Sequence, residues 1–234
     1  MIKKNKKKFN EYDGWELKHF DKSYNFRNYQ FKLFNKYIKG SIAEIGPGRG
    51  GNLIYYLDKA NKIDLYEPSK EIYLQLRNRF RKYKKINFYN KVFKSKKKYD
   101  SILYMDVLEH IKYDRSEIIN ALNSVKKNGY LIINVPAFSH LYSAFDKDVG
   151  HYRRYSKSDF KKILKKVKFQ KTSYVYYDSV GYFLSLLSKI FLTNYNSNFD
   201  KKIKFWNSLM WLSIILDKIF INSFGKSLFV FIKK

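Results

Sequence analysis

A short apolar segment that runs directly into a cluster of glycines is the feature that most constrains the fold. Residues 41–45 read Ser-Ile-Ala-Glu-Ile, and they are followed by the run Gly46-Pro47-Gly48-Arg49-Gly50-Gly51. A strand that ends in a glycine turn and leads into a helix lets a ligand approach the main chain, because glycine has no Cβ and the turn exposes amide groups. The run therefore predicts a ligand-binding turn, although several classes of nucleotide-binding enzyme use the same device.

Apolar segments of strand length alternate with segments of helical spacing along most of the chain. Such alternation predicts a parallel sheet with helices on both faces. We therefore expect an α/β fold with a Rossmann-like, seven-stranded, mostly parallel sheet. Strands are expected at 41–45, 62–66, 86–89, 99–104, 130–135, 172–177 and 228–232, and helices at 22–39, 52–60, 69–81, 114–126 and 157–166.

The length of 234 residues fits one domain with additions at its ends. We divide the chain into a basic N-terminal arm at 1–21, a core at 22–179, an apolar helical cap at 180–224 and a final edge strand at 225–234. Within the core, a polar and aromatic segment at about 137–156 follows the fifth strand and is expected to lie as a lid over the carboxyl ends of the strands.

Composition narrows the chemistry and the partners. The chain has no cysteine, which excludes disulfides, thiolate metal sites and cysteine nucleophiles. Its formal net charge is +28, but the lysines are scattered without regular aromatic interleaving. This charge suits a solvated surface, or a basic face toward an anionic membrane or a phosphorylated acceptor, and nucleic acid is not the expected partner. The charged N-terminus lacks an apolar stretch, so we expect a cytoplasmic protein, with peripheral attachment to the inner membrane face as the alternative.

Two acidic residues stand in register with the glycine turn. Glu44 comes just before Gly46, where a carboxylate can meet a cationic amino group. Glu67, followed by Pro68, closes the second strand, about 17 residues after Gly50. A carboxylate at that place can accept hydrogen bonds from both hydroxyls of a ribose.

These features resemble the class I S-adenosylmethionine-dependent methyltransferases, and within them the bacterial type 11, 12 and 23 groups. In that family an acidic residue precedes Gly-x-Gly-x-Gly, and a second acidic residue closes strand two. The resemblance implies S-adenosylmethionine as cofactor, with the glycines around its methionine part and Glu67 on its ribose. The cofactor-binding residues that it implies are Glu44, Gly46, Gly48, Gly50, Glu67, Pro68, Val92, Asp106 and Val107.

The segment Asp106-Val107-Leu108-Glu109-His110 adds a further match, since a Val-Leu-Glu-His turn is common after strand four in this family. It implies that Asp106 faces the methionine part of the cofactor. His110 is a candidate catalytic base, and the alternative is that Glu109 and His110 only hold the turn. The quinone-pathway O-methyltransferases place a metal on a similar Glu-x-x-Glu-His pattern. We predict no metal here, although Asp106, Glu109 and His110 would be its ligands.

The sequence departs from the family pattern after strand three. Many members carry an acidic residue there that bonds the adenine amino group, whereas this chain reads Asn90-Lys91-Val92-Phe93. Adenine is therefore expected to contact the backbone and either Val92 or Phe93.

The expected lid carries the candidate groups for the acceptor. Its stretch Gly150-His151-Tyr152-Arg153-Arg154-Tyr155 is similar to a bacterial methyltransferase subgroup associated with cell-envelope glycans and lipid-linked sugars. His151 or His140 can take a proton from an acceptor hydroxyl, and Arg154 with Arg153 can clamp a carboxylate or phosphate. The alternative is that these side chains only pair with Asp146 and Asp148.

Two apolar segments at 180–192 and 205–221 precede the last expected strand. They suit a packed cap, a dimer contact or a helix pair lying on a membrane. The sequence thus predicts methyl transfer to an oxygen of a small-molecule, glycan or lipid-linked acceptor. The alternatives are an RNA methyltransferase, against which the lack of an Asn-Pro-Pro-Tyr-like motif speaks, a non-catalytic S-adenosylmethionine-binding module, and an NAD-dependent oxidoreductase.

Overall fold

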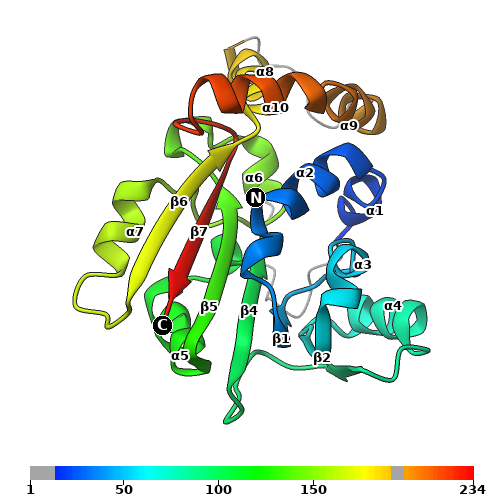
Figure 1. Ribbon diagram of the computed structural model, residues 1–234. Helices are drawn as coiled ribbons and strands as arrows, with labels where there is room; N and C mark the ends of the chain where they lie inside the picture. The colour runs from blue at the N-terminus through cyan, green and yellow to red at the C-terminus, as the bar shows by residue number, and fades with distance from the viewer. Residues whose placement is uncertain (1–13, 191–197) are drawn as a thin grey trace, which may run out of the picture.

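The computed structural model describes residues 14–190 and 198–234. Seven strands form one sheet in the order β3-β2-β1-β4-β5-β7-β6 (Figure 1). Strands β1 to β5 run parallel to their neighbours within that group, whereas β7 is antiparallel to both β5 and β6. This confirms the predicted Rossmann-like, mostly parallel sheet. The strands are β1 (Gly40–Ile45), β2 (Ala60–Tyr66), β3 (Ile86–Tyr89), β4 (Tyr99–Met105), β5 (Val125–Pro136), β6 (Lys171–Tyr177) and β7 (Ser227–Lys233).

Helices cover both faces of the sheet. Neighbouring residues of a strand point to opposite faces, so that Ile42 of β1 belongs to one core and Ala43 to the other. The Ile42 side is covered by α2, α3 and α4, and the Ala43 side by α5 and α7. The helices are α1 (Leu17–Phe20), α2 (Tyr24–Phe34), α3 (Leu53–Tyr56), α4 (Lys70–Phe80), α5 (Asp114–Asn123), α6 (Ala144–Asp148), α7 (Lys157–Ile163), α8 (Ser179–Ile190), α9 (Phe199–Ser208) and α10 (Met210–Ile219), with short 3-10 turns η2 (Asn35–Tyr37), η3 (Leu57–Lys59), η4 (Leu108–His110) and η5 (Ser139–Leu141).

The prediction that 225–234 forms an edge strand is wrong. β7 lies between β5 and β6, and its residues Leu228–Ile232 are all buried. The edge strand on this side of the sheet is β6, most of whose side chains are only half-buried. The physical reason is visible in the sequence, because the unbroken apolar run Leu-Phe-Val-Phe-Ile suits a strand that is covered on both faces.

The expected N-terminal arm is partly folded. Residues 1–13 lie outside the described residues, but 14–21 form a turn and the helix α1. Trp15 packs edge-on against Phe145 and Phe199, at 6.3 and 5.1 Å between ring centroids. Asp21 pairs with Arg49 at 3.2 Å. These contacts hold 14–21 against the rest of the protein, so a free basic arm is the wrong description for this part.

The cap consists of α8, α9 and α10, which lie together beyond one end of the sheet (Figure 1). Within 14–190 and 198–234, no helix is long and apolar enough to cross a bilayer. α8 packs against both α10 and η5, and α9 packs against α1 and α2. The cap therefore touches both the lid and the folded N-terminal segment.

Candidate active site

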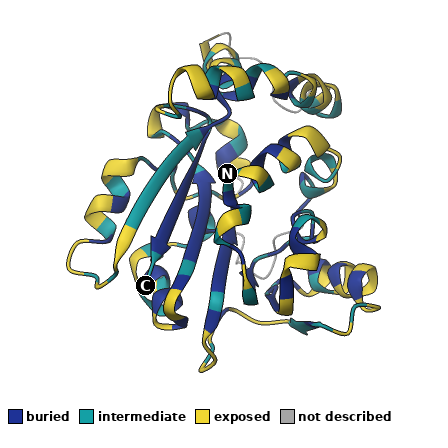
Figure 2. Ribbon diagram, in the orientation of Figure 1, coloured by how far each residue is buried: buried dark blue, intermediate teal, exposed yellow. Residues whose placement is uncertain are grey.

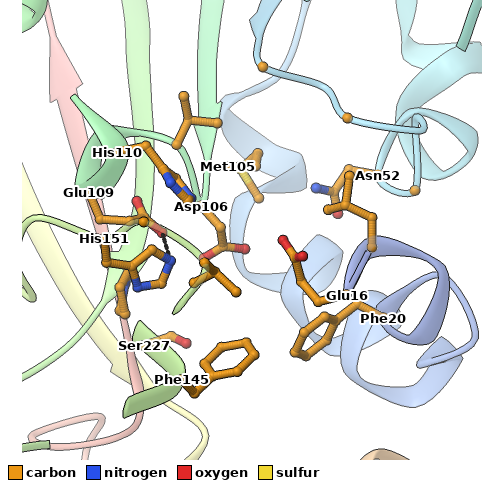
Figure 3. A pocket seen from close by; sticks show the side chains of 18 of the residues that line it. Glu16, Phe20, Asn52, Met105, Asp106, Glu109, His110, Phe145, His151 and Ser227 are labelled. Atoms are coloured by element: carbon orange, nitrogen blue, oxygen red, sulfur yellow. Dashed lines mark ion pairs between the residues drawn. The ribbon is translucent and has the colours of Figure 1, made fainter. Parts of the chain in front are cut away.

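A cavity of about 940 Å³ opens where β1, β2 and β4 end. Carboxyl ends of parallel strands are the usual ligand site of such a sheet, because the turns there expose main-chain amides. The lid, α1 and Trp206 of α9 complete the cavity wall. Figure 3 shows side chains from both sides of the cavity converging on the space around Asp106.

The glycine turn forms one wall. Gly46 and Gly48 line the cavity and have φ angles of 61° and 56°, a region in which L residues are strained. A Cβ on Gly46 would lie 2.7 Å from Val107. Gly50 plays a different part from the one predicted, because it does not line the cavity and a Cβ there would meet Phe80 of α4 at 2.4 Å. Gly50 therefore seats the turn on the core.

Two buried carboxylates flank the turn. Glu44 lines the cavity and hydrogen-bonds with the Tyr56 hydroxyl, and burial raises its pKa to about 7. Glu67 accepts hydrogen bonds from the backbone amides of Gly48 and Ser69, at 3.2 and 2.9 Å, and burial raises its pKa to about 7 as well. A carboxylate has about four acceptor sites, so Glu67 retains capacity for further donors in the cavity.

Asp106 stands at the centre of the cavity wall, after β4 (Figure 3). Its φ angle is 58°, an unusual value for a non-glycine residue, and burial raises its pKa. Its Oδ1 accepts a hydrogen bond of 2.6 Å from Asn134, which in turn accepts one from Tyr177 at 2.9 Å. A buried chain of polar side chains, which continues to Gln30 of α2, thus fixes the carboxylate.

The other residues predicted to bind the cofactor divide between two hollows. Pro68 lines the main cavity and also a smaller hollow of about 410 Å³. Val92 lines only the smaller hollow, where it is 63% exposed, and Phe93 is buried in the core. Val107 lines the main cavity beside Gly46. Val92 therefore stays a prediction that depends on a ligand reaching across Pro68.

The lid supplies a histidine that is held by a buried ion pair. The Nδ1 atom of His151 lies 2.8 Å from Asp146 Oδ1. Arg154 donates to the two oxygens of the same carboxylate, at 2.9 and 3.0 Å. Burial acts to raise the pKa of Asp146, but the hydrogen bond from His151 and the charge of Arg154 together hold it well below its ordinary value. Asp146 is therefore a fixed anion that orients the imidazole.

The other ring nitrogen of His151 faces a second carboxylate. Its Nε2 lies 3.9 Å from Glu109 Oε1, the ion pair drawn in Figure 3. Both oxygens of Glu109 are buried and have no hydrogen-bond partner. Burial, with the charges of Asp106 and Asp146, holds the pKa of Glu109 well above its ordinary value. A polar group that enters the cavity here would meet an imidazole nitrogen and an unsatisfied carboxyl group.

His110 completes this cluster but is a poor base. Burial and the neighbouring His151 lower its pKa to about 3, so its ring is neutral near pH 7. A base with so low a pKa has little driving force to accept a proton, which favours the interpretation that His110 holds the turn. Glu109, His110 and His151 each offer one atom that can ligate a metal, all within 4.8 Å of one another, and this is the only such group among the described residues. Asp106, which the sequence suggested as a ligand, is not in it.

The remaining polar residues of the lid are engaged elsewhere. Arg153 pairs with Asp114 at 2.6 Å and does not line the cavity. His140 hydrogen-bonds with Tyr182 of α8 at 3.1 Å, also outside the cavity. Arg154 lines the cavity, but its guanidinium forms an ion pair with Asp146. The pairing of lid side chains with Asp146 is thus found, and the paired arginines do not form an open clamp for an anion.

Several cavity residues were not anticipated from the sequence. They lie far apart along the chain and share only their position around the cavity, so that no local motif marks them. They include Trp15, Glu16, Phe20, Arg27, Asn52, Phe145, Trp206 and Lys226.

Comparison with known proteins gives one family and a set of similar folds. A family model described as a methyltransferase domain matches residues 17–174. No curated protein matches the chain. Phosphoethanolamine N-methyltransferase 2 from Haemonchus contortus, solved with phosphomonomethylethanolamine and S-adenosylhomocysteine, superposes with a TM-score of 0.67 at 14% identity. That match covers 97% of this chain and 60% of the helminth enzyme, so the chain spans 60% of its length.

Two further structures match over nearly their full length. The N-methyltransferase NodS from Bradyrhizobium japonicum, in complex with S-adenosylhomocysteine, has a TM-score of 0.59 at 11% identity, covering 95% of this chain and 92% of NodS. A SAM-dependent methyltransferase from Archaeoglobus fulgidus has a TM-score of 0.57 at 15% identity, covering 94% of this chain and 98% of that one. At such identities the likeness establishes the fold.

Proposed function

We propose that this chain, which belongs to the methyltransferase-domain family, transfers the methyl group of S-adenosylmethionine to a hydroxyl oxygen of a small-molecule, glycan or lipid-linked acceptor. Membership confirms the family, the enzyme class and the cofactor that the sequence predicted. The acceptor and the methylated atom are the proposed part. The observation that carries them is the imidazole of His151, which Asp146 orients and which lines the same cavity as the glycine turn.

The cofactor fits the end of the cavity near β1 and β2. The turn at Gly46 and Gly48 leaves room for the methionine part, and Glu67 offers acceptor sites to the ribose hydroxyls. Asp106 presents a carboxylate between the two ends of the cavity, where positive charge on the cofactor would lie. S-adenosylmethionine carries both an ammonium and a sulfonium charge, so a cavity lined by the carboxyl groups of Glu44, Glu67 and Asp106 suits it better than it would suit a neutral ligand.

His151 is proposed to remove the proton of the acceptor hydroxyl. Asp146 keeps the Nδ1 proton in place, so Nε2 carries the lone pair and faces the cavity. As the oxygen attacks the methyl carbon, the carbon–sulfur bond breaks, the hydroxyl proton passes to Nε2, and S-adenosylhomocysteine leaves. Asp146, which stays ionised, lies 2.8 Å from Nδ1 of the new imidazolium and stabilises its charge.

An amine acceptor is the second candidate. It is favoured by Glu109, because a buried carboxyl group with no hydrogen-bond partner suits an acceptor that brings a cationic or donor-rich nitrogen. The phosphoethanolamine enzyme and NodS are also N-methyltransferases. His151 would deprotonate an ammonium before it attacks, but an amine that is already neutral needs no base, whereas a hydroxyl must lose its proton in every case. The oriented imidazole therefore favours the hydroxyl acceptor.

Calorimetry with S-adenosylmethionine and S-adenosylhomocysteine, with NAD as control, tests the cofactor end. We expect both sulfur nucleotides to bind and NAD not to bind. An acceptor screen with isotopically methyl-labelled cofactor, starting with lipid-linked sugars and then amines, tests the acceptor end. Carbon NMR of the product separates O-methyl from N-methyl. An N-methyl product would replace the leading candidate with the second, and cofactor binding without turnover on any acceptor would indicate a non-catalytic binding module.

A further inference from the structure

α10 buries two polar side chains beside Met210 and Ile214, and it exposes an apolar side. Ser213 and Asp217 face inward and are completely buried. Trp211, Ile215 and Ile219, spaced four residues apart on the opposite side, are 61%, 46% and 64% exposed. A helix on the surface of a protein in water normally shows the reverse arrangement.

Buried hydrogen bonds fix α10 in this orientation. Asp217 accepts from the backbone amides of Asp178 and Ser179, at 2.8 and 3.0 Å, and from the Tyr29 hydroxyl at 2.8 Å. Ser213 donates to Asp178 at 3.0 Å. Turning the helix to bury its apolar side would break all of these bonds and leave buried polar groups without partners. The exposed apolar side is therefore held outward by the fold.

The neighbouring helix α8 extends the same surface. Its exposed apolar residues Phe183, Leu187 and Ile190 follow a spacing of four and three residues, which places them on one side of the helix. α8 packs along α10, and Figure 2 shows exposed positions on both helices at the end of the molecule away from the sheet. We call these three residues, together with Trp211, Ile215 and Ile219, the outer cap face.

We infer that the outer cap face docks on an anionic lipid surface, with α8 and α10 lying in the plane of the headgroups. The charge of the cap helices favours an anionic lipid surface as the partner of the outer cap face. Every exposed charged residue of α8 to α10 is a lysine, Lys189 and Lys218 among them, apart from Asp200, which pairs with Lys204 at 3.0 Å. Helices that lie in a membrane interface combine such lysines with an apolar side that carries tryptophan.

A second copy of the chain is the competing occupant, and charge opposes it. Each copy has a formal net charge of +28, so that two identical faces would bring like charges together. The same charge attracts an anionic leaflet, and the attraction acts before apolar contact is made.

The outer cap face is connected to the candidate active site. Trp206 of α9 lines the cavity, and Phe199 at the start of α9 stacks on Phe145 of the lid at 5.7 Å. On the other side, Tyr182 of α8 hydrogen-bonds with His140 of the lid. Docking would thus bring the lid next to the membrane, where a lipid-linked acceptor would enter. This last step rests on the proposed function, whereas the docking itself does not.

Vesicle flotation tests the docking. We expect the wild-type protein to float with phosphatidylcholine vesicles that contain phosphatidylglycerol, and to float less with phosphatidylcholine alone or in high salt. In the variant Trp211→Ser/Ile219→Ser, we expect the partition coefficient to fall by more than about tenfold, because moving even one large apolar side chain out of water contributes roughly that factor. Both residues are exposed, so the fold should persist.

The matched control is Leu74→Ser. Leu74 is 46% exposed, as Ile215 is, but it lies on α4, far from α10 (Figure 1). This control should float like the wild type. A wild type that stays with the soluble fraction, or a double variant that floats equally well, overturns the inference, as does a wild-type dimer in light scattering that the double variant abolishes. S-adenosylhomocysteine binding, measured on all three proteins, reports on the proposed function separately.

Discussion

The two ends of the cavity are built in different ways. The cofactor end is made by neighbouring residues of one turn, Gly46 and Gly48, and by Glu67 at the end of the adjacent strand. The acceptor end is made by side chains that converge from separate segments, with Glu109 after β4 and His151 in the lid. The first therefore depends on backbone geometry, and the second on tertiary packing.

This difference explains how each end can be altered. A main-chain turn tolerates little change, because every substitution at a positive φ strains it. A cluster of side chains can change one member while the sheet stays intact. Proteins of one fold can therefore keep the same cofactor end and bind the same cofactor. Their acceptor ends can differ in side chains and so bind different acceptors.

The largest effect is expected at the acceptor end. His151→Ala should lower turnover roughly 10²- to 10⁴-fold, the usual contribution of a positioned base, and leave S-adenosylhomocysteine affinity unchanged. Steady-state kinetics and calorimetry on the same preparation measure the two quantities. His140→Ala is the control, since this histidine of the lid lies outside the cavity. If His151→Ala abolished cofactor binding, the division of the cavity into two ends would be wrong.

The buried carboxylates of the cofactor end make stability depend on pH. Burial raises the pKa of Glu44 from 4.5 to about 7, so the folded state holds a proton that the unfolded chain releases between these values. This contribution to the free energy of unfolding is greatest at low pH and falls as the pH rises from 4.5 to about 7, by roughly 3 kcal/mol for a shift of this size. Glu67, with the same shift, adds to the slope. Thermal melts across this range should show a smaller slope for Glu44→Gln, and an unchanged slope would contradict the assignment.

Glu67→Ala should weaken the binding of the cofactor by roughly 1.5 to 3 kcal/mol, because the ribose hydroxyls lose a charged hydrogen-bond acceptor. Turnover at saturating cofactor should change little, which is the opposite of the pattern at His151. Calorimetric titration gives the affinity. The control is Glu71→Ala, an exposed carboxylate on α4 that does not line the cavity. Equal affinities for the Glu67→Ala protein and the wild type would remove Glu67 from the cofactor site.

The contrast between local main-chain geometry and tertiary packing also explains which features could be predicted from the sequence. The strand, the glycine turn and Glu67 were foreseen because their spacing is local and the turn needs glycine. The place of β7 was missed because strand order is a tertiary property, although its unbroken apolar run pointed to an interior strand. Trp15 was missed because a lone aromatic residue in a basic segment carries no sign of the ring contacts that fold it over the cavity.

The lid shows an intermediate case. His151 was a candidate because histidine in such a segment can accept a proton, and its pairing with Asp146 was named as an alternative. The two hypotheses, that His151 is a base and that it pairs with Asp146, are compatible, because the pairing uses Nδ1 and leaves Nε2 toward the cavity. Arg154 was expected to bind an anion of the acceptor, but Asp146 already satisfies it. The sequence can identify candidate side chains, but only the tertiary structure shows which nitrogen of an imidazole ring forms the hydrogen bond.

The smallest effect is expected from metal removal. The Nε2 of His151 cannot take the acceptor proton and bind a divalent ion at the same time, so the proposed base requires methyl transfer to survive treatment with EDTA and gel filtration. The opposing hypothesis is that a metal ion takes part in the reaction, bound by Glu109, His110 and His151, which can offer three ligand atoms. Activity that is lost on chelation and restored by Mg²⁺ or Mn²⁺ would make His151 a ligand. In that case Glu109→Gln should lower metal binding, measured by calorimetry, whereas the substitution changes no metal binding if Glu109 is not a ligand.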